Sequence, residues 1–158
     1  MPSIDLDALD RSILKKLQQN GRLSNVQLAA EVGLSESACL RRVRILEEGG
    51  IIDRYVMLIN QSAIGRPNNV FVRVTLDGQQ REALERFEGE ISRVVEVMEC
   101  YLMAGDFDYL LRVITRDNAD YVRVHNKLTS LPGVMRVQSS FALKTVLGRT
   151  EIPVDLMS

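Results

Sequence analysis

The sequence contains few of the residues that catalytic and metal sites use. Its 158 residues include one histidine, two cysteines and no tryptophan, and only 5% are aromatic. Cys39 and Cys100 lie far apart within apolar patterns, so we expect buried thiols rather than a disulfide or a metal pair. No nucleophile beside a base and no glycine-rich phosphate loop is visible. We therefore expect no enzyme, no metal and no cofactor.

Long hydrophobic runs and an excess of one charge are also missing. No run of about 20 apolar residues could span a membrane, and Met1 to Asp5 lack the basic and apolar pattern of a leader. A formal net charge of −1 argues against a non-specific coat protein for nucleic acid. With 46% hydrophobic residues, the composition is that of a globular protein. We expect two domains, no membrane partner and a cytoplasmic location.

The stretch from Ser24 to Ile52 has the pattern of two helices joined by a tight turn. Ser24 is a suitable N-cap for the first helix, and Gly33 can adopt the left-handed conformation that ends it. Ser35 can cap a second helix, which the Gly49-Gly50 pair stops. Two short helices joined in this way are typical of a helix-turn-helix reader of duplex DNA.

The second helix of this pair would separate a basic side from an apolar side. At about 100° per residue, Ser37, Arg41 and Arg44 fall within roughly 60° of one another. Cys39 and Leu46 fall on the opposite side. The first turn can therefore approach base edges, while the two arginines can contact phosphates.

Arg42 lies outside this basic side and is either a structural arginine or a contact to the DNA backbone. The helix pair can also be an ordinary hairpin with a solvated basic face. The caps, the turn and the segregated arginines occur together, which favours DNA binding. The candidate DNA-binding residues are Ser24, Asn25, Ser35, Glu36, Ser37, Arg41, Arg42 and Arg44.

A further helix comes first in the chain. Asp5 or Asp7 can cap it, and Asn20-Gly21 is a strong turn signal at its end. Residues 1–52 would then form a three-helix, winged helix-turn-helix domain. Ile52 to Asn60 is β-branched and aromatic, which predicts a wing or a linker strand within a β linker over residues 53–68.

The periodicity changes after the linker, where apolar residues alternate from Asn69 to Leu76. The expected strands cover residues 69–76, 94–103, 109–115 and 134–143, and the expected helices cover residues 80–92 and 118–131. This βαββαβ order is typical of a ferredoxin-like sandwich. The fold class is therefore α+β, with a second domain over residues 69–158.

Three segments resemble the Lrp/AsnC family of bacterial and archaeal transcription regulators. They are residues 21–52 (G-R-L-S-N-V-Q-L-A-A-E-V-G-L-S-E-S-A-C-L-R-R-V-R-I-L-E-E-G-G-I-I), 105–111 (G-D-F-D-Y-L-L) and 131–134 (L-P-G-V). The resemblance extends from Leu6 to about Thr145. It implies a β linker and a βαββαβ domain that dimerises through its sheet, often within octamers that bind an amino acid or related metabolite between dimers. S-E-S-A opens the second helix of the pair where many relatives have S-P-S-P, so the operator is not carried over.

The turn from Ala104 to Tyr109 is the second candidate site. On its residues alone, Gly105-Asp106 is a standard hairpin turn; the resemblance implies that the effector-binding turn lies here. Asp106 or Asp108 can receive an ammonium group, and backbone amides around Gly105 can receive a carboxylate. The candidate effector-binding residues are Met103, Ala104, Gly105, Asp106, Phe107 and Asp108, with Ser139, Ser140, Phe141 and Ala142 as a second wall by the same resemblance.

We therefore expect a sequence-specific DNA-binding transcriptional regulator that responds to an amino acid or a related metabolite. Its expected partners are double-stranded DNA, the effector and further copies of the chain, first as a homodimer and then as a higher oligomer such as an octamer. Two alternatives remain open. One is a tetrapyrrole decarboxylase with the same two-domain plan, and the other is an architectural DNA-binding protein without an effector.

Overall fold

The computed structural model describes residues 5–156, so the first four residues, where a leader would begin, lie outside it. The chain forms two compact units. One contains the chain up to Leu58 together with the segment from Leu147 onward, and the other is Ile59–Val146. No helix in the described residues is long and apolar enough to cross a membrane.

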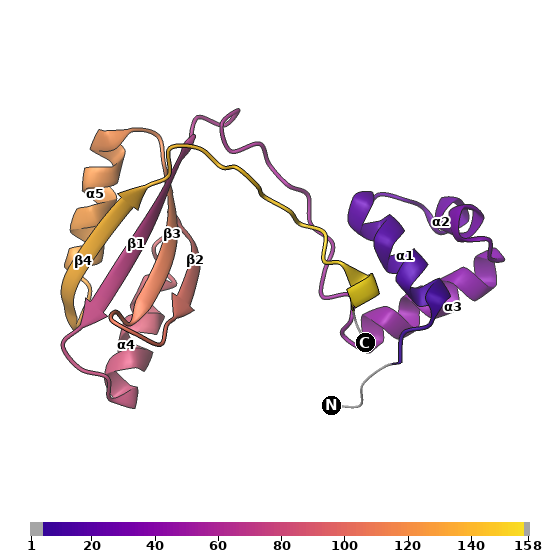
Figure 1. Ribbon diagram of the computed structural model, residues 1–158, viewed down its shortest axis with the longest axis horizontal. Helices are drawn as coiled ribbons and strands as arrows, with labels where there is room; N and C mark the ends of the chain where they lie inside the picture. Colours follow the sequence, from indigo (N-terminus) through magenta and orange to yellow (C-terminus); the bar gives the residue numbers. More distant parts are fainter. Residues whose placement is uncertain (1–4, 157–158) are drawn as a thin grey trace. The chain divides into compact units, whose positions relative to one another are not determined.

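The first unit contains three helices, as the sequence predicts. They are α1 (Ala8–Gln19), α2 (Asn25–Val32) and α3 (Glu36–Glu48) (Figure 1). Asp7, Ser24 and Ser35 are the N-caps, and each side chain accepts a backbone N–H of the first turn. Gly33 ends α2 with a φ of 71°, the left-handed conformation expected of it. The helix-turn-helix prediction is confirmed.

The C-terminal segment completes the core of this first unit. Val154 is buried with Ile13 and Cys39, and it lies in the short 3-10 helix η1 (Val154–Leu156) beside α1 (Figure 1). The Gln18 side chain accepts the Ile152 N–H at 2.6 Å and donates to the Ile152 carbonyl at 3.0 Å. The predicted boundary places this segment with the sheet domain instead. One isolated apolar position in the sequence gave no periodic signal of where it packs.

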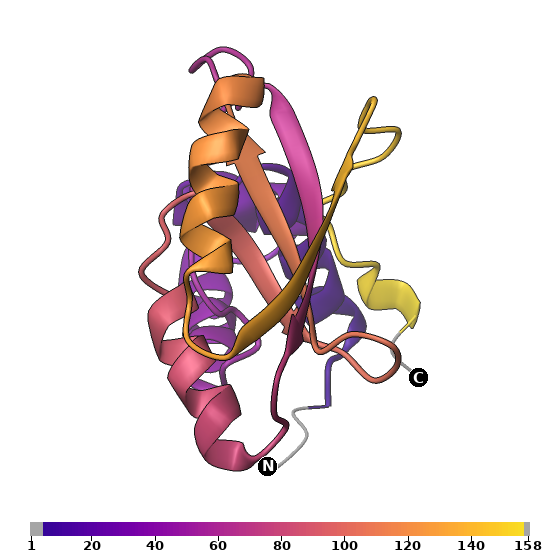
Figure 2. The same cartoon turned by 90° about the vertical axis from the view of Figure 1, so that its left-hand side faces the viewer.

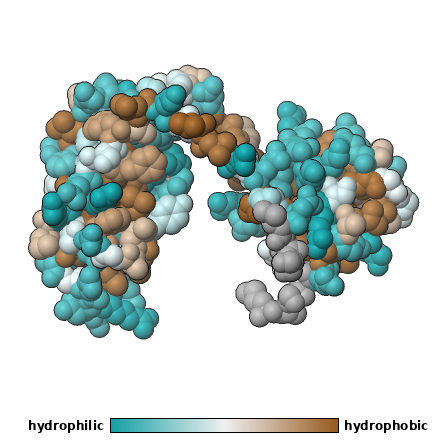
Figure 3. Space-filling view, viewed as in Figure 1, coloured by the Kyte–Doolittle hydropathy of each residue, from teal (hydrophilic) through white to brown (hydrophobic). Residues whose placement is uncertain are grey.

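The predicted wing and linker strand at Ile52–Asn60 are not found, because residues 53–60 form no strand within the described chain. A strand needs a neighbour to accept and donate its backbone hydrogen bonds, and none of the described strands pairs with this segment. Its apolar side chains are exposed from Tyr55 to Ile59, with Met57 at 82%. Hydrophobic side chains are visible along the segments that connect the units (Figure 3).

The second unit is a four-stranded antiparallel sheet covered on one face by two helices (Figure 2). The strands run in the order β2-β3-β1-β4. The elements are β1 (Asn68–Leu76), α4 (Arg81–Ile91), β2 (Val97–Leu102), β3 (Tyr109–Thr115), α5 (Asn118–Thr129) and β4 (Val134–Phe141). This βαββαβ arrangement confirms the ferredoxin-like prediction.

The alternation along β1 determines which face of the sheet is covered. Val70, Val72 and Val74 are each at most 1% exposed and pack under the helices, whereas Phe71 points to the open face and is 40% exposed. At the sheet edge, the thiol of Cys100 on β2 is exposed, so the prediction that both cysteines are buried is wrong for this one. An edge strand has a neighbour on one side only, and this leaves its side chains less covered.

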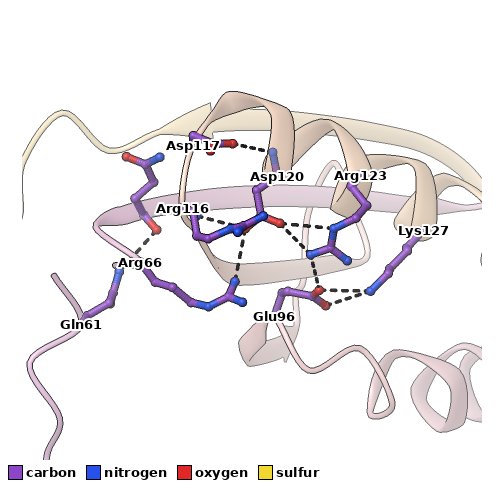
Figure 4. Close-up of polar contacts among 9 residues, drawn as sticks. Gln61, Arg66, Glu96, Arg116, Asp117, Asp120, Arg123 and Lys127 are labelled. Atoms are coloured by element: carbon purple, nitrogen blue, oxygen red, sulfur yellow. Dashed lines mark hydrogen bonds and ion pairs between the residues drawn. The ribbon is translucent and has the colours of Figure 1, made fainter. Parts of the chain in front are cut away.

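Asp120 is a buried carboxylate at the start of α5 (Figure 4). It accepts the Arg116 backbone N–H at 3.0 Å, the Arg66 guanidinium at 3.2 Å and the Arg123 guanidinium at 2.7 Å. The Arg116 amide and the Arg123 side chain lower the pKa of Asp120 to about 2. Asp120 therefore remains charged and fastens the segment that enters β1 to α5.

Glu96 extends this ion-pair network beneath α5 (Figure 4). Its carboxylate is 5% exposed and contacts Arg123 at 2.7 Å and Lys127 at 3.1 Å. Burial by itself would raise the pKa of Glu96, but the hydrogen bonds from Arg123 and Lys127 outweigh it and lower the pKa. The cations on this side of α5 therefore neutralise buried carboxylates of their own chain.

Candidate DNA interface and effector loop

The outward side of α3 carries two arginines that are free to bind a ligand. Arg41 and Arg44 are exposed, and within residues 5–156 neither forms an ion pair. Ser37 is exposed on the same side of the helix, while Cys39 and Leu46 are buried on the other at 0% and 1% exposure. The separation predicted from the helical period is thus present in the structure. It offers one hydroxyl and two guanidiniums to the solvent.

Arg42 is held inside the first unit. Its Nη1 atom donates to Asp10 Oδ1 and to Asp7 Oδ2, both at 2.8 Å. The hydrogen bond to Asp10 is the largest cause, and that to Asp7 the next, of a raised pKa of the Arg42 guanidinium. The two carboxylates also form the capping box of α1, so Arg42 fastens α3 to the start of α1. Of the two interpretations of Arg42, the structure favours the structural arginine over the DNA contact.

Three further candidates fix the starts of α2 and α3. The hydroxyls of Ser24 and Ser35 each accept the backbone N–H three residues on, at 3.2 and 3.3 Å. The Asn25 side chain donates to the Glu36 carbonyl at 2.8 Å and so joins the starts of the two helices. These side chains orient α3, and the Glu36 side chain itself is exposed beside the turn.

Arg22 is an exposed cation that the sequence argument missed. It lies in the turn before α2 and forms no ion pair within the part of the chain that the structure describes. The sequence places Arg22 two residues before the α2 N-cap, but no periodic pattern shows on which side a turn residue points, and the fold shows that it is exposed.

The second candidate site is the loop of residues 103–108 between β2 and β3. The Met103 N–H donates to the Asp108 carbonyl at 2.8 Å and closes the loop at its base. Gly105 has a φ of 136°, a conformation that side chains disfavour, so this glycine is required at the tip. Met103 to Asp106 are exposed, and their backbone and side-chain groups are therefore accessible.

Asp108 has a structural role, which favours Asp106 among the two aspartates predicted as ammonium receptors. It is 5% exposed and accepts the Leu76 N–H at 2.7 Å and the Gln79 side-chain amide at 2.8 Å, one on each carboxylate oxygen. Its backbone N–H donates to the Val74 carbonyl at 3.0 Å. Asp108 therefore fastens the loop to the end of β1, and Asp106 is the carboxylate of the loop that remains exposed.

Phe107 in the loop contacts Arg73, a residue of β1. The guanidinium carbon of Arg73, on the open face of β1, lies 5.2 Å from the centre of the Phe107 ring, within the range of a cation–π contact. The strand pattern places Arg73 on the face opposite the core. It gives no indication that a loop more than thirty residues later folds onto that position, and sequence reasoning missed it.

The second wall predicted for the effector site begins on β4, which lies on the other side of β1 from β3. The loop leads into Tyr109, which pairs with Val74, whereas Phe141 pairs with Val70 at the other end of β1. Four residues of strand correspond to about 13 Å. Ser139 hydrogen-bonds to the hydroxyl of Tyr121 on the helix-covered face.

The remaining members of this wall also have partners elsewhere in the unit. Phe141 packs edge-on against Tyr121, and the Ala142 N–H donates to Asn69. Ser140 lies opposite Phe71 on the open face.

The first unit has three helices, and the arginines on the outward side of its last helix form no ion pair within residues 5–156. The second unit is a sheet domain with an exposed glycine loop. Together they define a DNA-binding protein with a ligand-binding domain. The family models agree with this class. Residues 6–47 match the AsnC-type helix-turn-helix domain, and residues 69–152 match the Lrp/AsnC ligand binding domain. The chain belongs to the Lrp/AsnC family of transcriptional regulators.

Individual relatives match over almost the whole chain. The Bkd operon transcriptional regulator of Pseudomonas aeruginosa is 43% identical over 95% of this chain and 99% of its own. The leucine-responsive regulatory protein of Escherichia coli K12 is 40% identical, over 92% and 89%. An AsnC family regulator of Agrobacterium tumefaciens matches with a TM-score of 0.92 at 38% identity, over 97% and 100%. A Neisseria meningitidis transcriptional regulator in complex with L-Met matches with a TM-score of 0.90 at 37%, over 96% and 98%.

Proposed function

We propose that this protein binds specific sites on double-stranded DNA through α3 and regulates transcription there. The observation that carries this proposal is the pair of exposed arginines, Arg41 and Arg44, which have no carboxylate partner within residues 5–156. A guanidinium that is not neutralised by its own chain can release counterions from a phosphate when it binds. Ser37 and the first turn of α3 would face base edges in the major groove, and Arg22 would contact the backbone nearby.

The effector is an amino acid bound at the loop of residues 103–108. The neighbouring structure from Neisseria meningitidis holds L-Met, which supports a ligand of this class. Asp106 would take the ammonium group, and the apolar side chain would lie against Met103, Ala104 and Phe107. Effector binding would change DNA affinity by a coupling free energy of about 1–3 kcal/mol.

The working form is a homodimer that assembles further, up to an octamer. Phe71 and Tyr101 are exposed at 40% and 52%, and both lie on the open face of the sheet. The apolar segment Tyr55–Ile59 has no strand partner within the described chain. A second copy could cover both surfaces, and two copies of α3 would then contact half-sites about one helical turn apart. The chain has no catalytic step in this scheme and acts in the cytoplasm, where it meets DNA.

Selection of bound DNA from a random pool, repeated with each of the twenty standard amino acids, tests this function. We expect one enriched sequence with two related half-sites, and a change in its affinity with at least one amino acid. Retention of all sequences alike would instead indicate an architectural DNA-binding protein. An enriched sequence whose affinity no amino acid changes would refute the effector.

A further inference from the structure

The loop of residues 103–108 carries a negative group at its tip and meets a positive group from β1. Asp106 is exposed, and the next residue, Phe107, is the ring on which the Arg73 guanidinium lies. The other carboxylate of the loop, Asp108, is buried and fully used by Leu76 and Gln79. Asp106 is therefore the accessible carboxylate of the loop, and Arg73 is the guanidinium that contacts the loop through Phe107.

Arg73 has N–H donors that are available to a ligand. It is exposed, and within the described residues it forms no ion pair. The residues paired directly with it on the open face are Leu110 on β3 and Gln138 on β4, and neither carries a charge. The charged residues diagonal to it on this face are Arg112, which is paired with Glu99, and Arg136. A guanidinium has five N–H donors. The Phe107 ring contacts the guanidinium through its π face and uses none of these donors in a conventional hydrogen bond.

The Phe107 ring also makes Arg73 a better receptor. An exposed arginine loses side-chain entropy when a ligand orders it. A guanidinium already held over a ring by a cation–π contact has lost part of that freedom before the ligand arrives. A planar guanidinium binds a carboxylate through two parallel N–H···O bonds, which fixes the orientation of the ligand as well as adding affinity.

We propose that Arg73, held over the ring of Phe107, binds the α-carboxylate of the effector while Asp106 binds its α-ammonium group. This assignment rests on the proposed function and specifies the ligand class, a free amino acid with both charged groups intact. It replaces the backbone amides around Gly105 as the main receptor of the carboxylate. Amines and amino acid amides, which have no carboxylate, are selected against.

The position of Arg73 also accounts for coupling between the effector and assembly. Arg73 lies on the same face of β1 as Phe71, two residues away, and that face is the proposed contact with a second copy. A carboxylate on Arg73 neutralises a positive charge beside this contact. Effector binding therefore changes the electrostatics of association directly.

Calorimetric titration of the full chain tests the assignment by changing the ligand's carboxylate and the Arg73 side chain in turn. The probes are L-methionine and L-methioninamide, which differ in the carboxylate. For the wild type we expect methionine to bind about 10- to 100-fold more tightly than the amide. Arg73→Gln should weaken methionine binding by a similar factor and leave amide binding unchanged, while Arg73→Lys should retain part of the affinity. Arg112→Gln is the matched control, because Arg112 lies on the same face but is paired with Glu99 at 2.7 Å.

The outcomes separate this assignment from the proposed function. Equal binding of methionine and its amide by the wild type would overturn the assignment without any variant. An equal loss of both probes in Arg73→Gln would also overturn it, because the arginine would then act on the fold and not on the carboxylate. If neither methionine nor any other standard amino acid binds the wild type, the effector function fails and the assignment fails with it.

Discussion

The two units of this chain use arginine in opposite ways on their main helices. On α3, Arg41 and Arg44 face solvent and have no carboxylate partner among the described residues, whereas Arg42 forms ion pairs with Asp7 and Asp10. On α5, Arg123 and Lys127 are pinned to carboxylates of which less than a tenth is exposed. A paired cation stabilises its own unit, whereas an unpaired one is available to a ligand. The partner of each arginine, and not its presence on a helix, therefore indicates its function.

The largest effect is expected from removing both unpaired arginines of α3. Arg41→Gln combined with Arg44→Gln should weaken DNA binding by about a hundredfold at fixed salt, because two phosphate contacts are lost. Gel-shift titration on a selected site measures it. Arg42→Gln is the control, and we expect it to lower thermal stability while DNA affinity stays close to wild type. A larger loss of DNA affinity from Arg42→Gln than from the double variant would reverse the comparison.

The two aspartates of the loop of residues 103–108 show the same contrast between a partnered and an exposed charged side chain. Asp108→Ala should cost about 2 kcal/mol of unfolding free energy, because it leaves the buried Leu76 N–H without an acceptor. Asp106→Ala should leave stability within about 0.5 kcal/mol, since Asp106 is exposed, and should weaken amino acid binding. Urea unfolding measures the first effect and calorimetry the second. Equal stability of the two variants would show that burial does not separate their roles.

The C-terminal segment offers a smaller test in the first unit. Val154→Ala should destabilise that unit by about 1–2 kcal/mol, because a buried side chain loses two carbons and leaves a cavity. Ile152→Ala is the control on the same segment, because the Ile152 side chain is 70% exposed and its contact to Gln18 is through the backbone. Hydrogen exchange of α1 amides reports the difference, which vanishes if this segment does not pack on α1.

The smallest effect is the pH dependence of the Asp120 network. Asp120 has a pKa of about 2 when folded and an ordinary value of 3.8, so its stabilising contribution is present above pH 4 and is lost as pH falls toward 2. Between pH 5 and pH 3 the loss should be about 1 kcal/mol. Asp120→Asn should flatten this part of the stability curve. An unchanged curve would mean that Asp120 is not charged within the network.

Local sequence patterns were sufficient to predict the helices and strands. They were insufficient to predict which segments pair or pack with one another. Caps at Asp7, Ser24 and Ser35 and the alternation along β1 act over a few residues, and they predicted the helices and strands to within three residues at each end. The linker was mispredicted because a strand exists only with a neighbour. β-propensity at Tyr55–Ile59 cannot say whether the same chain supplies one.

The candidate functional residues also divide into those that local sequence patterns predict and those whose roles depend on distant partners. Arg41 and Arg44 could be found from helical spacing, because the period fixes which side of α3 they occupy. The structural roles of Arg42 and Asp108 could not, since their partners lie 32 and 35 residues away for Arg42 and 32 away for Asp108. The contact between Arg73 and Phe107 joins a strand to a distant loop and has no local signal at all.

The salt dependence of DNA affinity is the most direct test of the claim that the two unpaired arginines of α3 mark the DNA-binding surface. The slope of log affinity against log salt concentration is measured for the wild type, Arg42→Gln, and the Arg41→Gln, Arg44→Gln double variant. We predict that the double variant lowers the slope by about two for each copy of α3 that binds, and that Arg42→Gln leaves it unchanged. Equal slopes in the wild type and the double variant would contradict the account.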